Sequence, residues 1–316
     1  MPEYTRLKGI NNIGDQQLST HVESNLVEFF NWGLLGVGGF YNINRDYTAP
    51  YGGNPSTLRL CDDRRFPKGM VWEGYRGGWV WENNIEYNSQ PIQISGIYVD
   101  NAFYPVGTTG TYAYNISYPL GRVCFDAPIA ASSTVQVEYS YRQYHFYPGS
   151  TQWFRQFIDR LSRIDDSQFN QYGSGIWSIF GDNRVQLPAV VVESVPRRRY
   201  RPIALGGGQW CETDVAFHVF AETSYDRDQI IDIITYQNEK AFFFFNKNVM
   251  TQSGIYPLDI NGYLVNSNYN YPYLINNCLW RWSRIKNVTS QETENDSPSL
   301  YHGLARMTLE IQFPEL

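Results

Sequence analysis

Apolar and polar residues alternate along much of this chain with the period of two that turns one face of a β-strand toward a core. Between residues 135 and 142 the apolar positions are Val135, Val137, Tyr139 and Tyr141, with polar residues between them. Residues 305–313 repeat this pattern. We therefore expect a half-buried antiparallel sheet over 92–146 and a closing strand over 305–313. Further strands are predicted at 185–193, 213–222 and 240–245.

Three segments instead have the spacing of amphipathic helices: 19–32, 151–164 and 226–237. The first opens with a capping-box pattern at Thr20 and Glu23, and the third with an Asp-led variant at Asp226 and Gln229. Glycines from Gly33 onward are expected to end the first helix.

The most concentrated positive charge lies in four arginines, Arg197, Arg198, Arg199 and Arg201. Prolines at 196 and 202 enclose them and a glycine cluster follows, which predicts an exposed loop or arm between two strands. Two interpretations stay open: a solvated loop, or an arm whose guanidinium groups bind carboxylates of a neighbouring subunit or phosphates of passing DNA. Because the chain is acidic overall, we favour a protein partner. The polar segment 285–299 is predicted to be a mobile loop.

These elements predict an α+β fold, mostly antiparallel β with three main helices. The period changes from strand to helix after the turn Tyr147-Pro148-Gly149-Ser150, which marks the expected domain boundary. We expect an N-terminal helical segment at 1–39, a β-rich domain at 40–147 and an α+β core with a C-terminal strand at 148–316.

Aromatic residues make up 16% of the chain, with 25 Tyr, 18 Phe and 9 Trp. They fill β-sheet cores, and Tyr and Trp are also enriched in protein interfaces. Trp72, Trp79 and Trp81 lie in an aromatic passage where Trp79 and Trp81 alternate as on a strand. If exposed, these three tryptophans would form a contact platform.

Charge and apolar content exclude several classes of partner. The net charge is −6 and the pI about 5.3, which does not favour binding of nucleic acid or of an anionic membrane surface. No run approaches the ~20 apolar residues that cross a bilayer, and the first residues lack the apolar core of a signal peptide, so synthesis in the cytoplasm is expected. The four cysteines are scattered without CxxC spacing, which predicts reduced thiols.

Motifs that carry chemistry are missing from the sequence. The stretch from Gly36 to Tyr41 lacks the last glycine of GxGxxG and follows a predicted helix, so it does not predict a nucleotide site. Gly173-Ser174-Gly175 is not GxSxG, and neither HExxH nor an EF-hand loop occurs. We expect no catalytic, cofactor-binding or metal-ligating residues and a protein that is not an enzyme. A carboxylate pair of a glycoside hydrolase stays open, because its two residues are distant in sequence.

The second half resembles the tail-terminator and neck proteins of tailed bacteriophages. The resemblance lies in an α-β-β-α-β order over 151–245, in Ala204-Leu205-Gly206-Gly207 before an aromatic strand, and in Asp226-Arg227-Asp228 at the next helix. Residues 257–264 also look like virion proteins. The 40–146 region would then be an added β domain on a terminator-like core.

This resemblance implies a virion structural protein that forms a homo-oligomeric ring, commonly a hexamer, at the head-to-tail neck. Such a ring caps the tail tube and joins it to the head connector or adaptor. Its partners would be itself, the tube or sheath protein and the connector, with DNA passing through without specific binding, no membrane, and assembly in the host cytoplasm. The alternative is a tail-tip or fibre-associated protein that binds a carbohydrate or other receptor.

Overall fold

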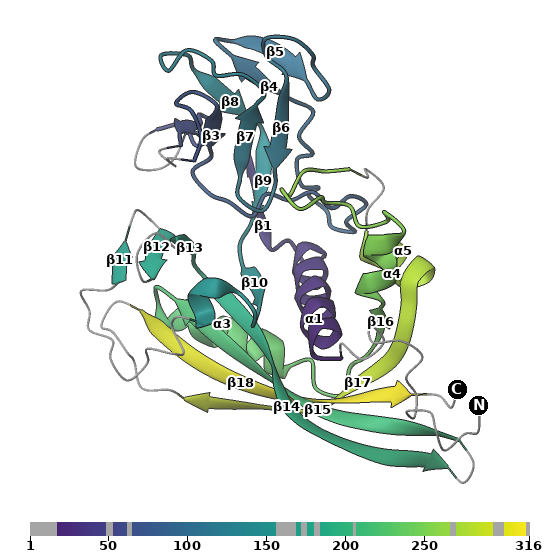
Figure 1. Ribbon diagram of the computed structural model, residues 1–316. Helices are drawn as coiled ribbons and strands as arrows, with labels where there is room; N and C mark the ends of the chain where they lie inside the picture. The colour runs from purple at the N-terminus through teal and green to yellow at the C-terminus, as the bar shows by residue number, and fades with distance from the viewer. Residues whose placement is uncertain are drawn as a thin grey trace. The chain divides into compact units, whose positions relative to one another are not determined.

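A computed structural model describes residues 18–48, 53–61, 65–155, 169–171, 176–179, 184–204, 207–265, 270–292 and 300–313 (Figure 1). The fold is α+β and rich in antiparallel strands, as the sequence predicts. The chain divides into two compact units. The larger unit contains 1–31, 145–253 and 271–316, and the smaller contains 32–144 and 254–270. The expected segment 1–39 is therefore not a unit of its own. The chain passes from the smaller to the larger unit between Tyr144 and His145, close to the predicted boundary at 147/148.

The larger unit is built on a six-stranded sheet with the order β10-β14-β15-β18-β17-β16. Its strands are β10 (His145–Pro148), β14 (Ala189–Ala204), β15 (Gly207–Ala221), β16 (Ala241–Phe245), β17 (Leu279–Glu292) and β18 (Tyr301–Phe313). β10 pairs parallel with β14, and the other pairs are antiparallel. A separate three-stranded sheet contains β11 (Phe169–Gln171), β12 (Ile176–Ile179) and β13 (Arg184–Gln186).

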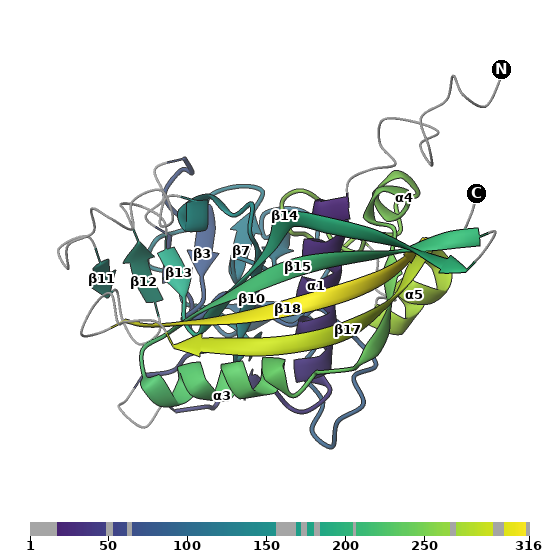
Figure 2. The ribbon, with the colours of Figure 1, turned by 90° about the horizontal axis from the view of Figure 1, so that it is seen from below.

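One face of the six-stranded sheet carries the helices α1 (Leu18–Leu35) and α3 (Ser224–Thr235). α1 crosses the strands whereas α3 runs along them (Figure 2). The ring of Phe30 in α1 lies 5.5 Å from Phe217 of β15 and 5.1 Å from Phe146 of β10. Gly303 of β18 leaves room for α3, because a Cβ there would lie 2.5 Å from the side chain of Ile231. Burial of these apolar positions fixes which way each strand faces.

The helix ends follow local hydrogen bonding. The amide of Gly39 donates to the carbonyl of Leu34 and that of Gly38 to Leu35, and Gly38 has φ +86°. This is the Schellman ending, in which glycine takes the left-handed position. α1 already includes Leu18, so the prediction that Thr20 caps it is wrong.

The N-cap of α3 lies three residues earlier than the sequence suggested. It is Thr223, whose hydroxyl accepts from the amide of Asp226 and donates to the Asp226 carboxylate. Asp226 is thus the closing residue of a capping box and not the residue that opens it. The shorter helices α4 (Lys247–Gln252) and α5 (Tyr271–Cys278) follow in the larger unit. Of the predicted helix 151–164, the residues from 156 onward lie outside the described residues.

The smaller unit contains three small sheets, with the orders β1-β9, β2-β3-β7-β6 and β5-β4-β8. The strands are β1 (Phe40–Ile43), β2 (Arg59–Leu60), β3 (Val71–Glu73), β4 (Gly96–Val99), β5 (Ala102–Pro105), β6 (Tyr114–Ser117), β7 (Arg122–Phe125), β8 (Val135–Val137) and β9 (Tyr139–Arg142). The expected single strand over 135–142 is two strands that pair with different neighbours. Its alternation therefore changes at Ser140, which is buried although the pattern placed it outside.

Two predicted loops are strands. Arg197–Pro202 lies inside β14, and residues 285–292 belong to β17, while 293–299 lie outside the described residues. The prolines suggested a loop, but a proline also fits a strand at a position whose nitrogen does not point toward a neighbouring strand. The polar positions of β17 face solvent in a paired strand, so their polarity did not indicate a loop.

Candidate assembly surface on strand β14

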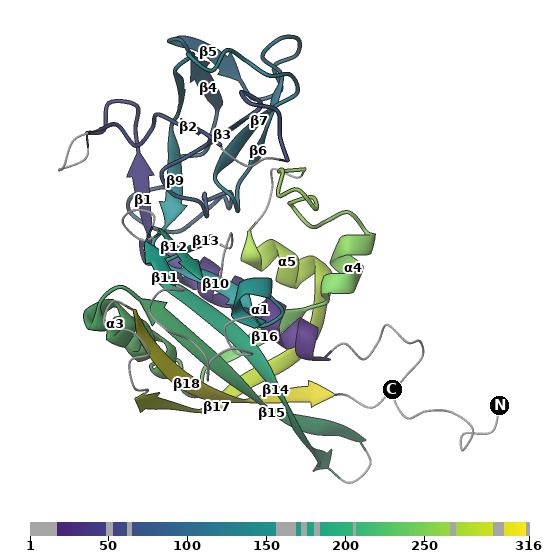
Figure 3. The same cartoon turned by 60° about the vertical axis from the view of Figure 1, so that its left-hand side comes forward.

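The four predicted arginines lie in the distal half of β14. β10 pairs with β14 only over Ala189–Val192, and a register shift separates Ser194 from Arg198 (Figures 1 and 3). Beyond this shift, β14 pairs with β15 as far as Ala204. We call Arg197–Ala204 the distal segment. Among the residues that the structure describes, no strand pairs with its other side.

The arginine side chains of the distal segment leave by both faces of the sheet. Arg198 turns to the α1 side, where its Nη2 donates to Oγ of Ser19 at 2.7 Å. Arg197 and Arg199 line a hollow on the opposite face, and Arg201 joins a polar network there. The expected arm is thus a strand that exposes guanidinium groups on both of its faces.

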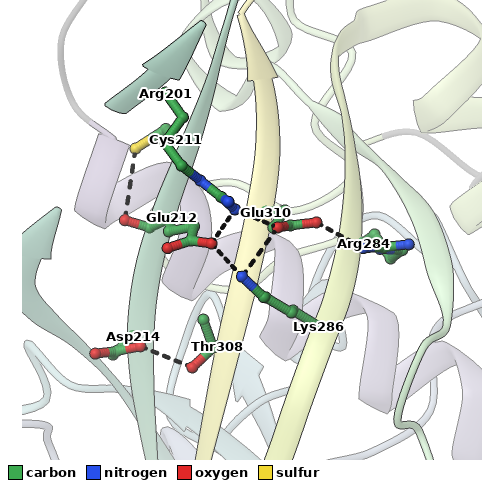
Figure 4. A network of polar contacts seen from close by, with 8 residues as sticks. All are labelled: Arg201, Cys211, Glu212, Asp214, Arg284, Lys286, Thr308 and Glu310. Atoms are coloured by element: carbon green, nitrogen blue, oxygen red, sulfur yellow. Dashed lines mark hydrogen bonds and ion pairs between the residues drawn. The ribbon is translucent and has the colours of Figure 1, made fainter. Parts of the chain in front are cut away.

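The polar network spans β14, β15, β18 and β17 (Figure 4). Glu212 and Glu310 stand directly opposite each other on β15 and β18, a placement that repels when both are charged. Arg201 and Lys286 each contact both carboxylates, and Arg201 lies 2.8 Å from Glu310. Arg284 adds a contact of 2.8 Å to Glu310. The cations thereby hold two like charges together at the centre of this face.

The hydrogen bond from Lys286 is the main cause that lowers the pKa of Glu212 from its ordinary value. The same bond raises the pKa of Lys286. Both groups are therefore charged at neutral pH. Five cationic side chains on this face, Arg197, Arg199, Arg201, Arg284 and Lys286, meet three carboxylates, Glu212, Asp214 and Glu310. The face carries an excess of positive charge on a chain that is acidic as a whole.

Arg197 and Arg199 border the hollow, whose volume is about 290 Å³. Its other lining residues are Glu212, Asp214, Lys286, Asn287 and Thr308. Asp214 is already bound by the hydroxyl of Thr308 at 2.8 Å. Within the described residues, neither Arg197 nor Arg199 has an ion pair like those of Arg201. These two guanidinium groups are the ones available to an anionic partner.

Lys286→Ala should lower the free energy of unfolding of the larger unit by about 0.2–1 kcal/mol at neutral pH, since the lysine is 39% exposed and water screens its pairs. Charged Glu212 stabilises the fold above its ordinary pKa, and this stabilisation is lost as the pH falls through its lowered folded-state pKa. The variant should therefore show a weaker loss of stability on acidification. Urea unfolding measured between pH 7 and about pH 3 tests this. The exposed Lys240→Ala is the control, and an identical acid dependence in both variants contradicts the assignment.

The predicted tryptophan platform is not at the surface. Trp72, Trp79 and Trp81 are only 3%, 0% and 6% exposed. The period-two spacing of Trp79 and Trp81 suggested one face of a strand, but Val80 between them is also fully buried. All three side chains are core residues of the smaller unit, so the platform as predicted is wrong for this chain.

A group of tyrosines that the sequence analysis did not single out lies on the smaller unit. Tyr41 of β1 and Tyr141 of β9 are cross-strand partners with ring centroids 5.4 Å apart. The guanidinium carbon of Arg76 lies 5.9 Å from the Tyr141 ring and 5.8 Å from that of Tyr75. Tyr41 and Tyr75 are exposed. The pairing of β1 with β9 sets Tyr41 beside Tyr141, and the bridge between Trp79 and Tyr141 brings the segment that contains Tyr75 and Arg76 to β9. Single-sequence patterns show neither contact.

Two histidines meet on the larger unit's sheet, on the face away from α1. Nδ1 of His218 lies 3.4 Å from Nε2 of His302, and Nε2 of His218 lies 3.4 Å from the Glu193 carboxylate. The hydrogen bond with His218 is the main cause that lowers the pKa of Glu193. Phe220 stacks on His302 with centroids 4.7 Å apart. His218 is therefore held by contacts with neighbouring side chains of its own sheet.

Within the described residues, no three His, Cys, Asp or Glu side chains are grouped so as to hold a metal ion. None of the described helices is long and apolar enough to cross a membrane.

No protein-family model matches the sequence, and no curated protein matches it either.

Proposed function

We propose that this chain is a non-enzymatic structural subunit that assembles into a ring through the distal segment of β14. The observation that carries the proposal is the concentration of four arginines on a strand with one unpaired side, in a chain with a net charge of −6. Unpaired strand sides and guanidinium groups are both recurrent means of binding another protein. A ring arises when each subunit offers one surface to a different surface of the next.

The ring that we favour is the one at the head-to-tail neck of a tailed bacteriophage, where it would cap the tail tube and join it to the head connector. The order β14, β15, α3, β16 supports this assignment because it repeats the β-β-α-β part of the order on which the resemblance rests. The smaller unit would be the added β domain. Acidic surface elsewhere would suit a channel through which DNA passes, since like charges repel within about 10 Å at ordinary salt.

Native mass spectrometry of the full chain tests the ring. We expect a closed oligomer, with six subunits if the resemblance holds. Arg197→Ala combined with Arg199→Ala should shift the population to monomer while circular dichroism stays unchanged, because both guanidinium groups line the exposed hollow. The matched control removes two exposed arginines of the smaller unit, Arg59 and Arg65. A chain that stays monomeric at every concentration contradicts the proposal, as does an oligomer that the double variant leaves intact.

A second candidate is a receptor-binding protein of a tail tip or fibre, and the group formed by Tyr41, Tyr75, Tyr141 and Arg76 favours it. Exposed aromatic rings stack on sugar rings, and a nearby guanidinium group binds acidic substituents. A trimer in the same mass spectrometry experiment would favour this candidate over the neck ring.

A further inference from the structure

Within the described part of the chain, the distal segment of β14 has a regular set of unpaired backbone groups. Proline occurs within a sheet where its nitrogen faces away from the neighbouring strand, and Pro202 stands opposite Gln209 of β15. Backbone groups alternate sides along a strand, so the residues in step with Pro202 face outward. The amide and carbonyl groups of Arg198 and Tyr200 are therefore the ones presented on the unpaired side. A strand laid there would find a donor and an acceptor at Arg198 and at Tyr200, and an acceptor alone at Pro202.

The side chains of the distal segment add a matching charge pattern. Arg197, Arg199 and Arg201 share one face at every second position, about 7 Å apart. Residues of an adjoining strand stand about 5 Å from these positions on the same face. Arg201 is already paired with Glu212 and Glu310, so Arg197 and Arg199 are the arginines available to an added strand.

The backbone and charge pattern of the distal segment favours some pairing partners over others. Two β14 segments from two copies would set arginine against arginine, which is unfavourable on adjoining strands. The chain's own residues 1–17 contain Glu3 and Asp15 against Arg6 and Lys8, so they offer no excess of negative charge. An extended segment with Asp or Glu at alternate positions matches both the backbone and the charges.

We propose that the distal segment of β14 binds an extended acidic segment of another protein as an additional strand, with carboxylates at alternate positions on Arg197 and Arg199. This inference rests on the proposed assembly role and names the chemistry of the partner at that surface. Backbone hydrogen bonds to Arg198 and Tyr200 supply affinity, and the spacing of the carboxylates supplies specificity.

Three peptides of seven residues test the proposal by fluorescence anisotropy on the full-length chain, diluted until it is monomeric. The first, TEVEVET, places its acids at alternate positions. The second, TEEEVVT, has the same composition and charge with the acids adjacent. The third is TEVEVET with N-methyl groups on the amides that would face β14. We expect the first to bind at least about tenfold more tightly than either of the others, because only it satisfies charges and backbone together.

Two variants of the chain separate the two contributions. Arg197→Glu with Arg199→Glu should abolish the preference for TEVEVET over TEEEVVT, and the same reversals at Arg59 and Arg65 of the smaller unit should not. Tyr200→Pro keeps all charges but removes one outward amide, so it should weaken TEVEVET binding about tenfold and leave TEEEVVT binding unchanged. Circular dichroism of each variant checks that it remains folded.

Equal binding of TEVEVET and TEEEVVT would overturn the proposal in favour of unspecific charge attraction. Binding of TEVEVET that appears only after deletion of residues 1–17 would also overturn it, because the chain's own segment would then be the occupant. A chain that forms a ring but does not distinguish the peptides contradicts this inference alone. A chain that distinguishes them but never forms a ring contradicts the ring alone.

Discussion

Replacing Glu82 with Ala should lower the free energy of unfolding of the smaller unit by about 3–5 kcal/mol. Nη2 of Arg142 lies 2.6 Å from both carboxylate oxygens of Glu82, and the two side chains are only 9% and 1% exposed. Without the carboxylate, a guanidinium charge stays buried in the fold with no charge to balance it. Urea unfolding followed by tryptophan fluorescence measures the loss, since Trp79 and Trp81 lie in the same unit.

The matched control is Glu73→Ala, which removes a carboxylate from an ion pair that is less buried. Glu73 and Arg122 lie 3.3 Å apart, with side chains 15% and 17% exposed. Water reaches both groups, so we expect a loss of about 1 kcal/mol. Replacing Glu82 and Arg142 together with Met should recover most of the stability, because no buried charge is then left alone. A loss below about 1 kcal/mol for Glu82→Ala contradicts the assignment of a buried pair.

Trp79→Ala should lower the free energy of unfolding of the smaller unit by about 3–5 kcal/mol. The side chain is fully buried, its ring stacks on Tyr139 with centroids 4.5 Å apart, and its Nε1 donates to the carbonyl of Arg76 at 2.8 Å. Removal of the indole leaves a cavity and removes this hydrogen bond. Urea unfolding with near-ultraviolet circular dichroism measures this change.

Tyr41→Ala removes an exposed aromatic ring, whereas Trp79→Ala removes a buried one, so it tests the receptor-binding candidate. Tyr41 is 48% exposed, so its removal should change the free energy of unfolding by about 1 kcal/mol or less. A glycan array that shows binding by the parent chain and none by Tyr41→Ala would favour the receptor-binding candidate. If Trp79→Ala remained fully stable and lost only binding, the burial of Trp79 described here would be contradicted.

Much of the fold follows from local patterns in the sequence. The alternation over 305–313 predicts most of β18, and the helical spacings predict α1 and α3, because each pattern records burial of one face. The distal segment of β14 escaped prediction for the opposite reason. It carries arginines on both faces, follows Pro196 and contains Pro202, so only the pairing with β15 shows that it forms a strand.

The candidate site was predictable in part. The concentration of charge at Arg197–Arg201 is visible in the sequence, whereas the carboxylates that hold Arg201 come from β15 and β18, the second of them 109 residues away. Burial of the three tryptophans likewise depends on partners distant in the chain. Local sequence gives the residue types of a site, but the register between distant strands determines which of them meet.

The position of β18 has a consequence for how the protein is made. β18 lies between β15 and β17 in the centre of the sheet, yet it follows β15 in the chain by roughly 90 residues. Ribosomes add about 5–20 residues per second, so β15 waits roughly 5–20 s for its second neighbour. During that time the backbone groups of β15 that later pair with β18 have no partner strand. They lie next to the apolar side chains of β15, Val215, Phe217 and Val219, and can pair with strands of other nascent chains. Synthesis in the cell is therefore a stage at which the open edge of β15 favours aggregation.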